Sequence, residues 1–383
     1  MKLREMTSIS KRRKFIEEKV GKKLDSISIY PKHLEDASRR NCENMIGTVQ
    51  IPLGIAGPLT IQGTYAKGEY YLPLATSEGA LVASLNRGCK AICQGGGVIV
   101  HTENAGMSRG AIFETGGIRE SFGLKNFILE NKLQFERESK KTSSHIALSK
   151  IDSKVIGRNL YVRFSFDTQD AMGMNMVTIA TQAIAAFIEK KTGLACLALA
   201  GNFDVDKKAS WLNAILGRGR CVWAEAILSS DIIAETLKTT PQKIHRVAVK
   251  KCLVGGAISG SIGFNAHFAN VIAAIFIACG QDAAHIVEGS IGITTTEVVN
   301  TGLSISIHLP DLPIGTVGGG TGLPSQSEAL SILGLEGGDK GSNAAAFAEI
   351  VGAAILAGEL SLLASLSEGS LASAHKRLTR GNA

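Results

Sequence analysis

Residues 156–200, IGRNLYVRFSFDTQDAMGMNMVTIATQAIAAFIEKKTGLACLALA, carry the pattern that decides the fold. A run of alternating apolar residues gives way to a helical period and then to a second short apolar run. With the segment before it, the expected elements are strand 111–115, helix 118–138, strands 145–152 and 156–167, helix 170–191 and strand 194–200. The order βαββαβ is typical of a ferredoxin-like module, in which two helices cover one face of an antiparallel sheet.

The rest of the chain predicts a larger unit around this module. Small apolar stretches such as VIAAIFIA (271–278) and AAILA (353–357) alternate with glycine clusters, which favours buried helices in close contact. We expect residues 1–46 to form a helical arm with a basic amphipathic helix over 8–24. Hairpin strands around 59–75 and a helix over 80–92 follow. The fold class is α+β: a large, mainly helical domain (47–109 and 201–383) with the ferredoxin-like domain (110–200) inserted into it.

Composition limits the classes of partner. The 383 residues include 41 Lys and Arg against 34 Asp and Glu, a net charge of +7 that suits a phosphorylated cofactor as well as nucleic acid. No aromatic residues interleave with the basic ones, so we expect no nucleic-acid partner. The N-terminus lacks a signal-like apolar segment, and no apolar run approaches the roughly 18 to 20 residues that span a bilayer. We expect a cytoplasmic protein without a membrane partner.

Cysteine and histidine spacing argues against a metal site. The seven cysteines form no C-x-x-C pair, so we expect reduced thiols. The eight histidines form no H-E-x-x-H motif, and no metal is expected.

Two segments are typical of phosphate or cofactor contacts. Asp170-Ala171-Met172-Gly173-Met174-Asn175-Met176 lies where a strand meets a helix, so Asp170 can cap that helix and the free N–H groups can face a phosphate. A simple helix cap above a methionine-lined core is the alternative. Val317-Gly318-Gly319-Gly320-Thr321 forms a glycine loop of the kind that cradles phosphate or a nicotinamide ring. Because the chain lacks G-x-G-x-x-G, a Rossmann domain is not supported.

Four ionisable positions stand out as candidates for catalysis. Glu78 precedes a helix, Asp282 follows a strongly apolar helix, Lys207 follows GNFDVD, and His375 lies in the tail. Each has a structural alternative: a helix cap for Glu78, a capped loop for Asp282, a solvated pair for Lys207 and Lys208, and a disordered tail for His375.

Taken together, several motifs resemble the 3-hydroxy-3-methylglutaryl-CoA reductase family. They extend over nearly the whole chain, from Glu43 to His375: ENMIG (43–47), IPLGIAGPL (51–59), ATSEGALVASLNRGCKAI (75–92), DAMGMNM (170–176), GNFDVDKK (201–208), GFNAHFAN (263–270), ACGQDAA (278–284), GTVGGGTGLPSQSEAL (315–330) and the tail histidine. DAMGMN and the tail are more similar to the biosynthetic class I branch than to the degradative class II branch.

The resemblance implies reduction of a 3-hydroxy-3-methylglutaryl-CoA thioester to mevalonate by two hydride transfers from NAD(P)H, a step of isoprenoid precursor synthesis. In that chemistry Lys207 stabilises the oxyanion. His375 protonates the coenzyme A thiolate, and Glu78 protonates the alkoxide of the second reduction. Asp282 keeps the pKa of Glu78 high through repulsion between like charges.

The resemblance also implies the binding residues. Those for the substrate's carboxylate and hydroxyl are Arg109, Asp206, Lys208, Lys251 and Asn270, and those for coenzyme A are Asn86 and Arg87. Those for the nicotinamide cofactor are Asp170, Met172, Gly173, Met174, Asn175, Val317, Gly318, Gly319, Gly320 and Thr321, with Ser143 and Ser144. A homodimer or larger oligomer with the site at its interface is implied, and the tail from Ser367 to Ala383 suits a movable cover.

Departures from the family pattern leave alternatives open. Ala200 replaces a serine that contacts substrate, and Ser143-Ser144-His145 lacks the arginine that pairs with the 2′-phosphate of NADPH. NADPH is the expected cofactor with NADH as the alternative, and Lys150 or Lys154 could supply the missing charge. NAD-dependent oxidation of mevalonate, a Schiff-base lyase using Lys207 and a catalytically silent binding protein are the competing functions.

Overall fold

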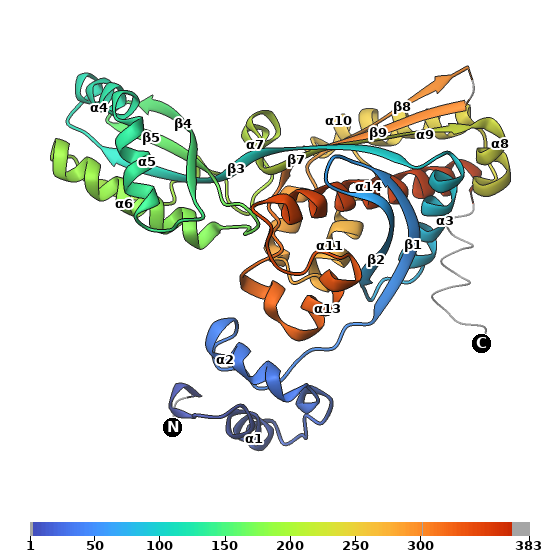
Figure 1. Cartoon of the computed structure of the whole chain (residues 1–383), viewed down its shortest axis with the longest axis horizontal. Helices are drawn as coiled ribbons and strands as arrows, with labels where there is room; N and C mark the ends of the chain where they lie inside the picture. The colour runs from blue at the N-terminus through green and yellow to red at the C-terminus, as the bar shows by residue number, and fades with distance from the viewer. Residues whose placement is uncertain (1–2, 301, 370–383) are drawn as a thin grey trace.

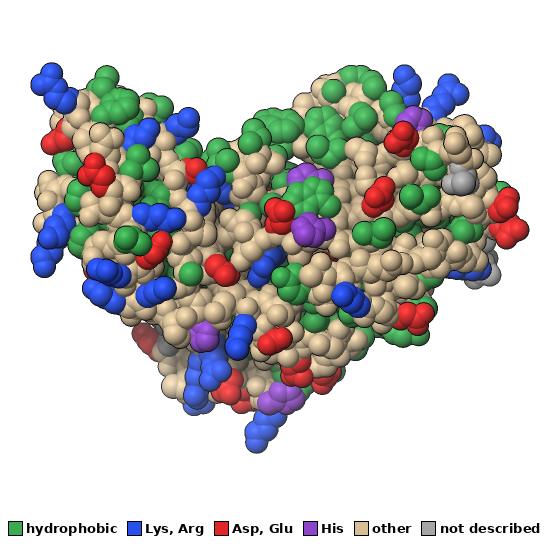
Figure 2. Space-filling view, turned by 45° about the horizontal axis from the view of Figure 1, so that its top comes forward, with side chains coloured by type: hydrophobic (Ala, Val, Ile, Leu, Met, Phe, Trp, Pro, Cys, Tyr) green, Lys and Arg blue, Asp and Glu red, His purple; other side chains and the backbone are tan. Residues whose placement is uncertain are grey.

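The computed structural model describes residues 3–300 and 302–369 and shows an α+β chain with a mixed sheet. Two lobes flank a notch, and the N-terminal arm extends below them (Figures 1 and 2). The strands are β1 (Leu53–Gln62), β2 (Lys67–Ala75), β3 (Val98–Glu114), β4 (Ala147–Ile156), β5 (Asn159–Asp167), β6 (Cys196–Ala198), β7 (Arg218–Ser229), β8 (Ile293–Val299) and β9 (Gly302–Leu312).

Helices cover one face of each part of the sheet (Figure 1). The longer ones are α1 (Ile9–Val20), α3 (Leu81–Gln94), α4 (Ile118–Glu130), α5 (Lys132–Lys140), α6 (Met174–Thr192), α9 (Pro241–Ala248), α11 (Phe268–Ala278), α13 (Pro324–Ile332) and α14 (Ser342–Glu368). The shorter ones are α2 (Ala37–Arg40), α7 (Trp211–Leu216), α8 (Ser230–Ile232), α10 (Gly256–Ser259) and α12 (Ile286–Gly289).

The long strand β3 belongs to both lobes. Its first half pairs with β1 and β7 in a path of order β2-β1-β3-β7-β9-β8. Its second half pairs with β5 and β6, and β4 pairs with β5, which gives the order β4-β5-β3-β6. The register shifts between Asn104 and Gly106, where the strand passes from one lobe to the other. Each lobe has its own hydrophobic core.

Elements expected between 110 and 200 are present, with three corrections. The strand expected over 111–115 is the end of the 17-residue β3. The helix expected over 118–138 ends at Glu130 and restarts at Lys132, because the Asn131 side chain donates to the Phe127 carbonyl and closes the first helix. The helix expected from 170 begins at Met174.

In the described part of the larger lobe, helices hold more residues than strands, as expected, but the lobe also contains strands that were not predicted. Strands β7, β8 and β9 form an extended antiparallel part of the sheet. Buried and exposed residues alternate along β7, as in a strand with one face on the core. The hairpin and the helix after Glu78 are confirmed as β1–β2 and α3. The helix predicted over 8–24 is confirmed as α1, but it ends at Val20, where Gly21 adopts a left-handed conformation.

The 27-residue helix α14 is the centre of the larger lobe. It is long and apolar enough to cross a membrane, which corrects the expectation that no apolar run reaches that length. Its apolar window is 83% buried, as in a core helix. Two buried acids on it bind loop backbones: Glu349 accepts N–H groups of Thr64, Tyr65 and Ala66, and Glu359 accepts those of Ala266 and His267.

Basic side chains do not gather in one stripe on the face that Figure 2 shows, where acidic side chains lie among them. All seven cysteines lie in the described part of the chain and are free. Burial raises the pKa of the thiols of Cys89 and Cys279 to about 12.

Helices α3 and α14 touch through glycine. A Cβ atom on Gly88 would collide with the carbonyl of Ala357, so only glycine permits this approach. This contact bears out the expectation of close packing through small residues.

We predict that Gly88→Ala lowers the free energy of unfolding by about 1–3 kcal/mol through overpacking. Gly123→Ala is the matched control, since Gly123 lies in α4 with nothing within 4 Å of its added Cβ. The control should raise stability by roughly 0.5–1 kcal/mol through helix propensity. Urea unfolding of both variants measures the difference, and equal midpoints would contradict the packing argument.

Candidate active site

The DAMGMN segment and the glycine loop lie side by side. Ala171 and Val317 form a parallel β-bridge, and the Thr316 N–H donates to the Asp170 carbonyl over 2.8 Å. Gly315 lies against the backbone of Met172, in a space that no Cβ could share. Two segments almost 150 residues apart thus form one wall.

Asp170 does not cap its own helix, so that expectation was wrong. The residue before α6 is Gly173, and it makes no side-chain cap. The Asp170 carboxylate instead accepts N–H groups from Asp339 (2.7 Å), Gly341 (2.7 Å) and Ala344 (2.9 Å) at the start of α14. The first N–H groups of α6 therefore have no side-chain cap from the described residues.

A cavity of about 690 Å³ joins these motifs to the ionisable candidates. Its walls include Met172 to Asn175 at the start of α6, Val317 to Thr321 of the glycine loop, Lys207 and Asp282. The structure thus brings together two of the four predicted catalytic residues and most of the predicted cofactor residues.

Lys207 and Asp282 form an ion pair, with 2.7 Å between Nζ and Oδ2. Burial opposes the charge of Asp282, but hydrogen bonds from Lys207 and from the Ala284 backbone outweigh it and lower the Asp282 pKa. Asp282 therefore also makes the loop cap that was its structural alternative.

Lys207 lies in a strained loop between β6 and α7. Asn202, Val205 and Lys207 have φ of 61°, 50° and 57°, a left-handed conformation that costs free energy in residues other than glycine. The Arg109 guanidinium lies 3.3 Å from Asp204 and 3.7 Å from Asp206, which places these three side chains of the loop and β3 together. Burial raises the Asp204 pKa.

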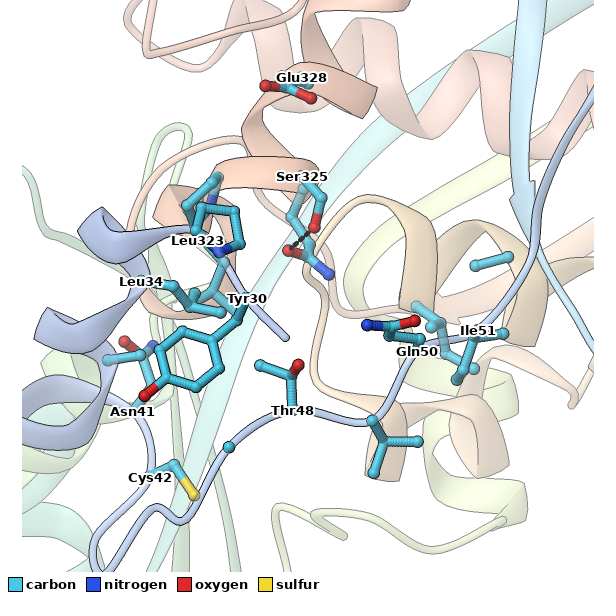
Figure 3. A pocket seen from close by; sticks show the side chains of 18 of the residues that line it. Tyr30, Leu34, Asn41, Cys42, Thr48, Gln50, Ile51, Leu323, Ser325 and Glu328 are labelled. Atoms are coloured by element: carbon cyan, nitrogen blue, oxygen red, sulfur yellow. Dashed lines mark hydrogen bonds between the residues drawn. The ribbon is translucent and has the colours of Figure 1, made fainter. Parts of the chain in front are cut away.

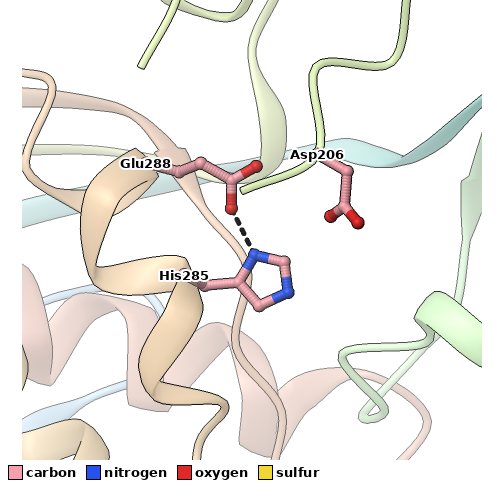
Figure 4. Close-up of side chains that lie close together, drawn as sticks. All are labelled: Asp206, His285 and Glu288. Atoms are coloured by element: carbon pink, nitrogen blue, oxygen red, sulfur yellow. Dashed lines mark hydrogen bonds and ion pairs between the residues drawn. The ribbon is translucent and has the colours of Figure 1, made fainter. Parts of the chain in front are cut away.

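A fully buried arginine, Arg218, holds this loop through an ion pair. Arg218 of β7 binds Asp206 (2.9 Å) and Glu288 (2.6 Å), and its Nε donates to Ser108 (3.1 Å). Glu288 in turn binds the His285 imidazole (Figure 4). Asp206, His285 and Glu288 have spacing that could hold a metal ion, but both carboxylates already bind the guanidinium of Arg218.

Glu78 lies with a second group of predicted residues. The Asn270 amide donates to Glu78 over 3.1 Å. Asn270 is near the start of α11, whereas Asp282 follows its end, and the helix rises about 12 Å between residues 270 and 278. Within one chain, the hydrogen bonds of the described residues therefore place Glu78 and Asp282 in different groups.

The remaining substrate and coenzyme A candidates have mixed surroundings. Lys251 is exposed, and Lys208 donates to the Asp206 carbonyl over 3.1 Å. Asn86 accepts the Gly57 N–H, and Arg87 binds Ser361 and Glu368 of α14. His375 and the tail from residue 370 lie outside the described residues.

A neighbouring cavity of about 480 Å³ shares Ala171, Met176 and Val317 with the first. Ser143, His145 and Lys340 line it, but Ser144 does not. Neither of the lysines suggested to replace the missing arginine lines it, and Lys150 pairs with Asp152 over 3.1 Å.

A third cavity, of about 530 Å³, separates the N-terminal arm from α13 (Figure 3). Tyr30, Leu34 and Leu323 line it and pack against the same small hydrophobic cluster, and Asn41 and Ser325 line it as well. Asn41 also donates to the Gly319 carbonyl over 3.1 Å, so the arm fixes the glycine loop.

Sequence reasoning missed Arg218, His285, Glu288 and Lys340. His285 and Glu288 lie three residues apart just after Asp282, a spacing that could have suggested one helical face. The partners of Arg218 come from distant segments, and no local pattern signals them.

Comparison with known proteins shows the family of the chain. The family model described as hydroxymethylglutaryl-coenzyme A reductase matches residues 8–380. A 3-hydroxy-3-methylglutaryl-coenzyme A reductase of Methanothermobacter thermautotrophicus is 50% identical over 97% of this chain and 93% of its own, and one of Methanocaldococcus jannaschii is 52% identical over 96% and 92%.

Among solved structures, a class II 3-hydroxy-3-methylglutaryl-CoA reductase from Streptococcus pneumoniae bound to NADPH has a TM-score of 0.70 at 18% identity. It covers 94% of this chain and 97% of that chain, a likeness of fold. On the family model and the relatives of about half-identical sequence, the chain belongs to the hydroxymethylglutaryl-coenzyme A reductase family.

Proposed function

We propose that the protein reduces 3-hydroxy-3-methylglutaryl-CoA to mevalonate and coenzyme A with two molecules of NADPH, in the cytoplasm, as a step of isoprenoid precursor synthesis. One observation carries the proposal: a single cavity of about 690 Å³ is lined by both cofactor motifs and by the Lys207–Asp282 pair. Family membership supplies the substrate.

Lys207 is the cation for the oxyanion. NADPH, when bound, supplies the hydride that attacks the thioester carbonyl. The Lys207 ammonium faces the cavity and is held by Asp282, so it can stabilise negative charge on the carbonyl oxygen without first reorganising. The same ion pair disfavours a Schiff-base lyase, because a charged ammonium is not a nucleophile.

Arg109 is suited to the substrate's carboxylate. Its guanidinium lies 3.3 Å from Asp204 and 3.7 Å from Asp206, and within residues 3–300 and 302–369 its buried Nε has no hydrogen-bond partner. An unpartnered buried donor costs free energy that an incoming carboxylate recovers.

The residues present fit a dinucleotide. The start of the 19-residue helix α6 lines the cavity, and no side chain in the described part of the chain caps it. Gly318 and Gly319 leave open space beside their backbone. His145 and Lys340 line the adjoining cavity near Ser143, where cations would meet the 2′-phosphate of NADPH. Lys340 therefore takes the role first considered for Lys150 and Lys154.

We further propose the domain division expected from the sequence: a helical arm (1–46), a substrate and coenzyme A domain (47–109 and 201–383), and an inserted ferredoxin-like cofactor domain (110–200). The element order from β3 to β6, the strand order β4-β5-β3-β6 and the separate core support it. Strand β3 crosses the boundary at 109–110 and joins the two domains.

The active site is completed by a second copy of the chain. Lys207, Asp282, Asp206 and Arg109 form one group beyond the end of α11, and Glu78 with Asn270 forms another near its start. A homodimer that brings the first group of one chain to the second group of its partner supplies Glu78 as the proton donor. His375 of the tail protonates the coenzyme A thiolate.

We predict that the purified protein oxidises NADPH when the thioester is added, and NADH less efficiently. Lys340→Ala should raise the KM for NADPH roughly tenfold and leave that for NADH nearly unchanged, because one phosphate contact is worth about 1.4 kcal/mol. Lys150→Ala is the control. Absorbance at the nicotinamide band measures both, and no thioester-dependent oxidation of either cofactor would refute the proposed function.

A second prediction tests the shared site. Glu78→Gln and Lys207→Ala should each abolish turnover. Mixing the two variants under conditions that exchange subunits should restore about a quarter of the activity, since half of the dimers are mixed and each then holds one intact site. A site contained in one chain would give no recovery, and that outcome would rule out the shared site.

A further inference from the structure

The side chain of Glu288 binds the backbone of Lys207. It lies on α12, is fully buried, and its Oε1 accepts the Lys207 N–H over 2.8 Å and a guanidinium N–H of Arg218 over 2.6 Å. Lys207 has a φ of 57°, a left-handed conformation that is unfavourable for residues other than glycine. Glu288 thus holds the main chain of the lysine in its strained conformation.

The other oxygen of Glu288 binds Nδ1 of His285, which is also fully buried (Figure 4). The opposite ring nitrogen, Nε2, lies 3.8 Å from Oδ2 of Asp282 and has no hydrogen-bond partner among the described residues. That Oδ2 is the oxygen that binds the Lys207 ammonium at 2.7 Å. Two routes therefore run from Glu288 to the same lysine, one to its backbone and one through His285 and Asp282 to its Nζ.

We propose that His285 and Glu288 are positioning residues that fix Lys207 at both ends, with His285 acting through Asp282. The inference rests on the proposed function. A lysine side chain has four rotatable bonds and loses up to about 2 kcal/mol of rotamer entropy when ordered. Ordering it before substrate binds places the charge where the oxyanion forms, and that raises kcat rather than affinity.

The charges around the imidazole favour this role. Asp282 and Glu288 face the two nitrogens of the ring. A carboxylate oxygen of Asp206 lies within 4.8 Å of a ring nitrogen of His285 and of a carboxylate oxygen of Glu288. The single charge of Arg218 is shared between Asp206 and Glu288, both of which pair with its guanidinium. A metal bound by Asp206, His285 and Glu288 is the alternative that the test must separate.

Two substitutions probe the two ring nitrogens separately. In His285→Gln the amide nitrogen reaches the position of Nε2 and can donate to Asp282, whereas in His285→Asn the amide reaches only the position of Nδ1 and Glu288. We expect His285→Asn to lower kcat for thioester reduction roughly 10- to 100-fold with KM values within about twofold. His285→Gln should recover most of kcat. Thermal unfolding checks that both variants fold.

His245→Asn is the matched control, because the His245 imidazole binds Thr296 away from this network. A folded His285→Asn with the wild-type kcat, equal losses in the Gln and Asn variants, or a rise in KM in place of a fall in kcat would overturn the inference. Activity that is lost on dialysis against EDTA and restored only by a divalent ion would overturn it as well.

If His285→Asn does not fold, Glu288→Gln replaces it. That variant keeps an acceptor for the Lys207 N–H but removes the charge that orients the imidazole, and the same fall in kcat is expected. A wild-type protein that does not reduce the thioester refutes the proposed function, whereas an active wild type with unaffected variants refutes this inference alone.

Discussion

The bond between the Asp170 carboxylate and the start of α14 is the interaction on which the cofactor site depends. Three backbone N–H groups point at one buried carboxylate, and the positive end of the helix dipole favours its charge. Asp170 comes from the smaller lobe, and α14 is the central helix of the larger lobe. Because the Asp170 carbonyl also accepts the Thr316 N–H, this one residue ties the DAMGMN segment to the glycine loop.

Two buried carboxylates of α14 itself also bind backbone N–H groups of other segments. Glu349 binds the turn between β1 and β2, and Glu359 binds the segment just before α11 and the Thr294 hydroxyl. In each case a carboxylate satisfies backbone N–H groups that would otherwise be buried without partners. Loops around the helix are thereby fixed by charge-assisted hydrogen bonds, which favours a site that is ordered before ligands bind.

Sequence patterns predicted what depends on local order. Helical composition located α11 and α14, and the motifs located Lys207, Asp282 and the glycine loop. The role of Asp170 was misassigned because a capping pattern predicts a partner a few residues away, whereas the real partners lie about 170 residues later. The support of Lys207 by Arg218 and Glu288 could not be predicted, since it depends on how β7 and α12 meet in space. Strands β7 and β9 were missed although their sequences carry the signal, since apolar and polar residues alternate along much of both strands.

The balance of charge around Lys207 explains how a site so rich in acids can accept an anionic substrate. The carboxyl groups of this region are matched by as many cations: Asp204, Asp206, Asp282, Glu288 and Asp311 against Arg109, Arg163, Lys207, Lys208 and Arg218. Burial raises the pKa of Asp311 well above its usual value, with Glu288 adding to the effect, and burial also raises the pKa of Asp204. Burial thus opposes the charged form of both acids, while the neighbouring arginines favour it. Under the proposed function, the substrate's carboxylate binds the Arg109 guanidinium, whose Nε has no hydrogen-bond partner among the described residues.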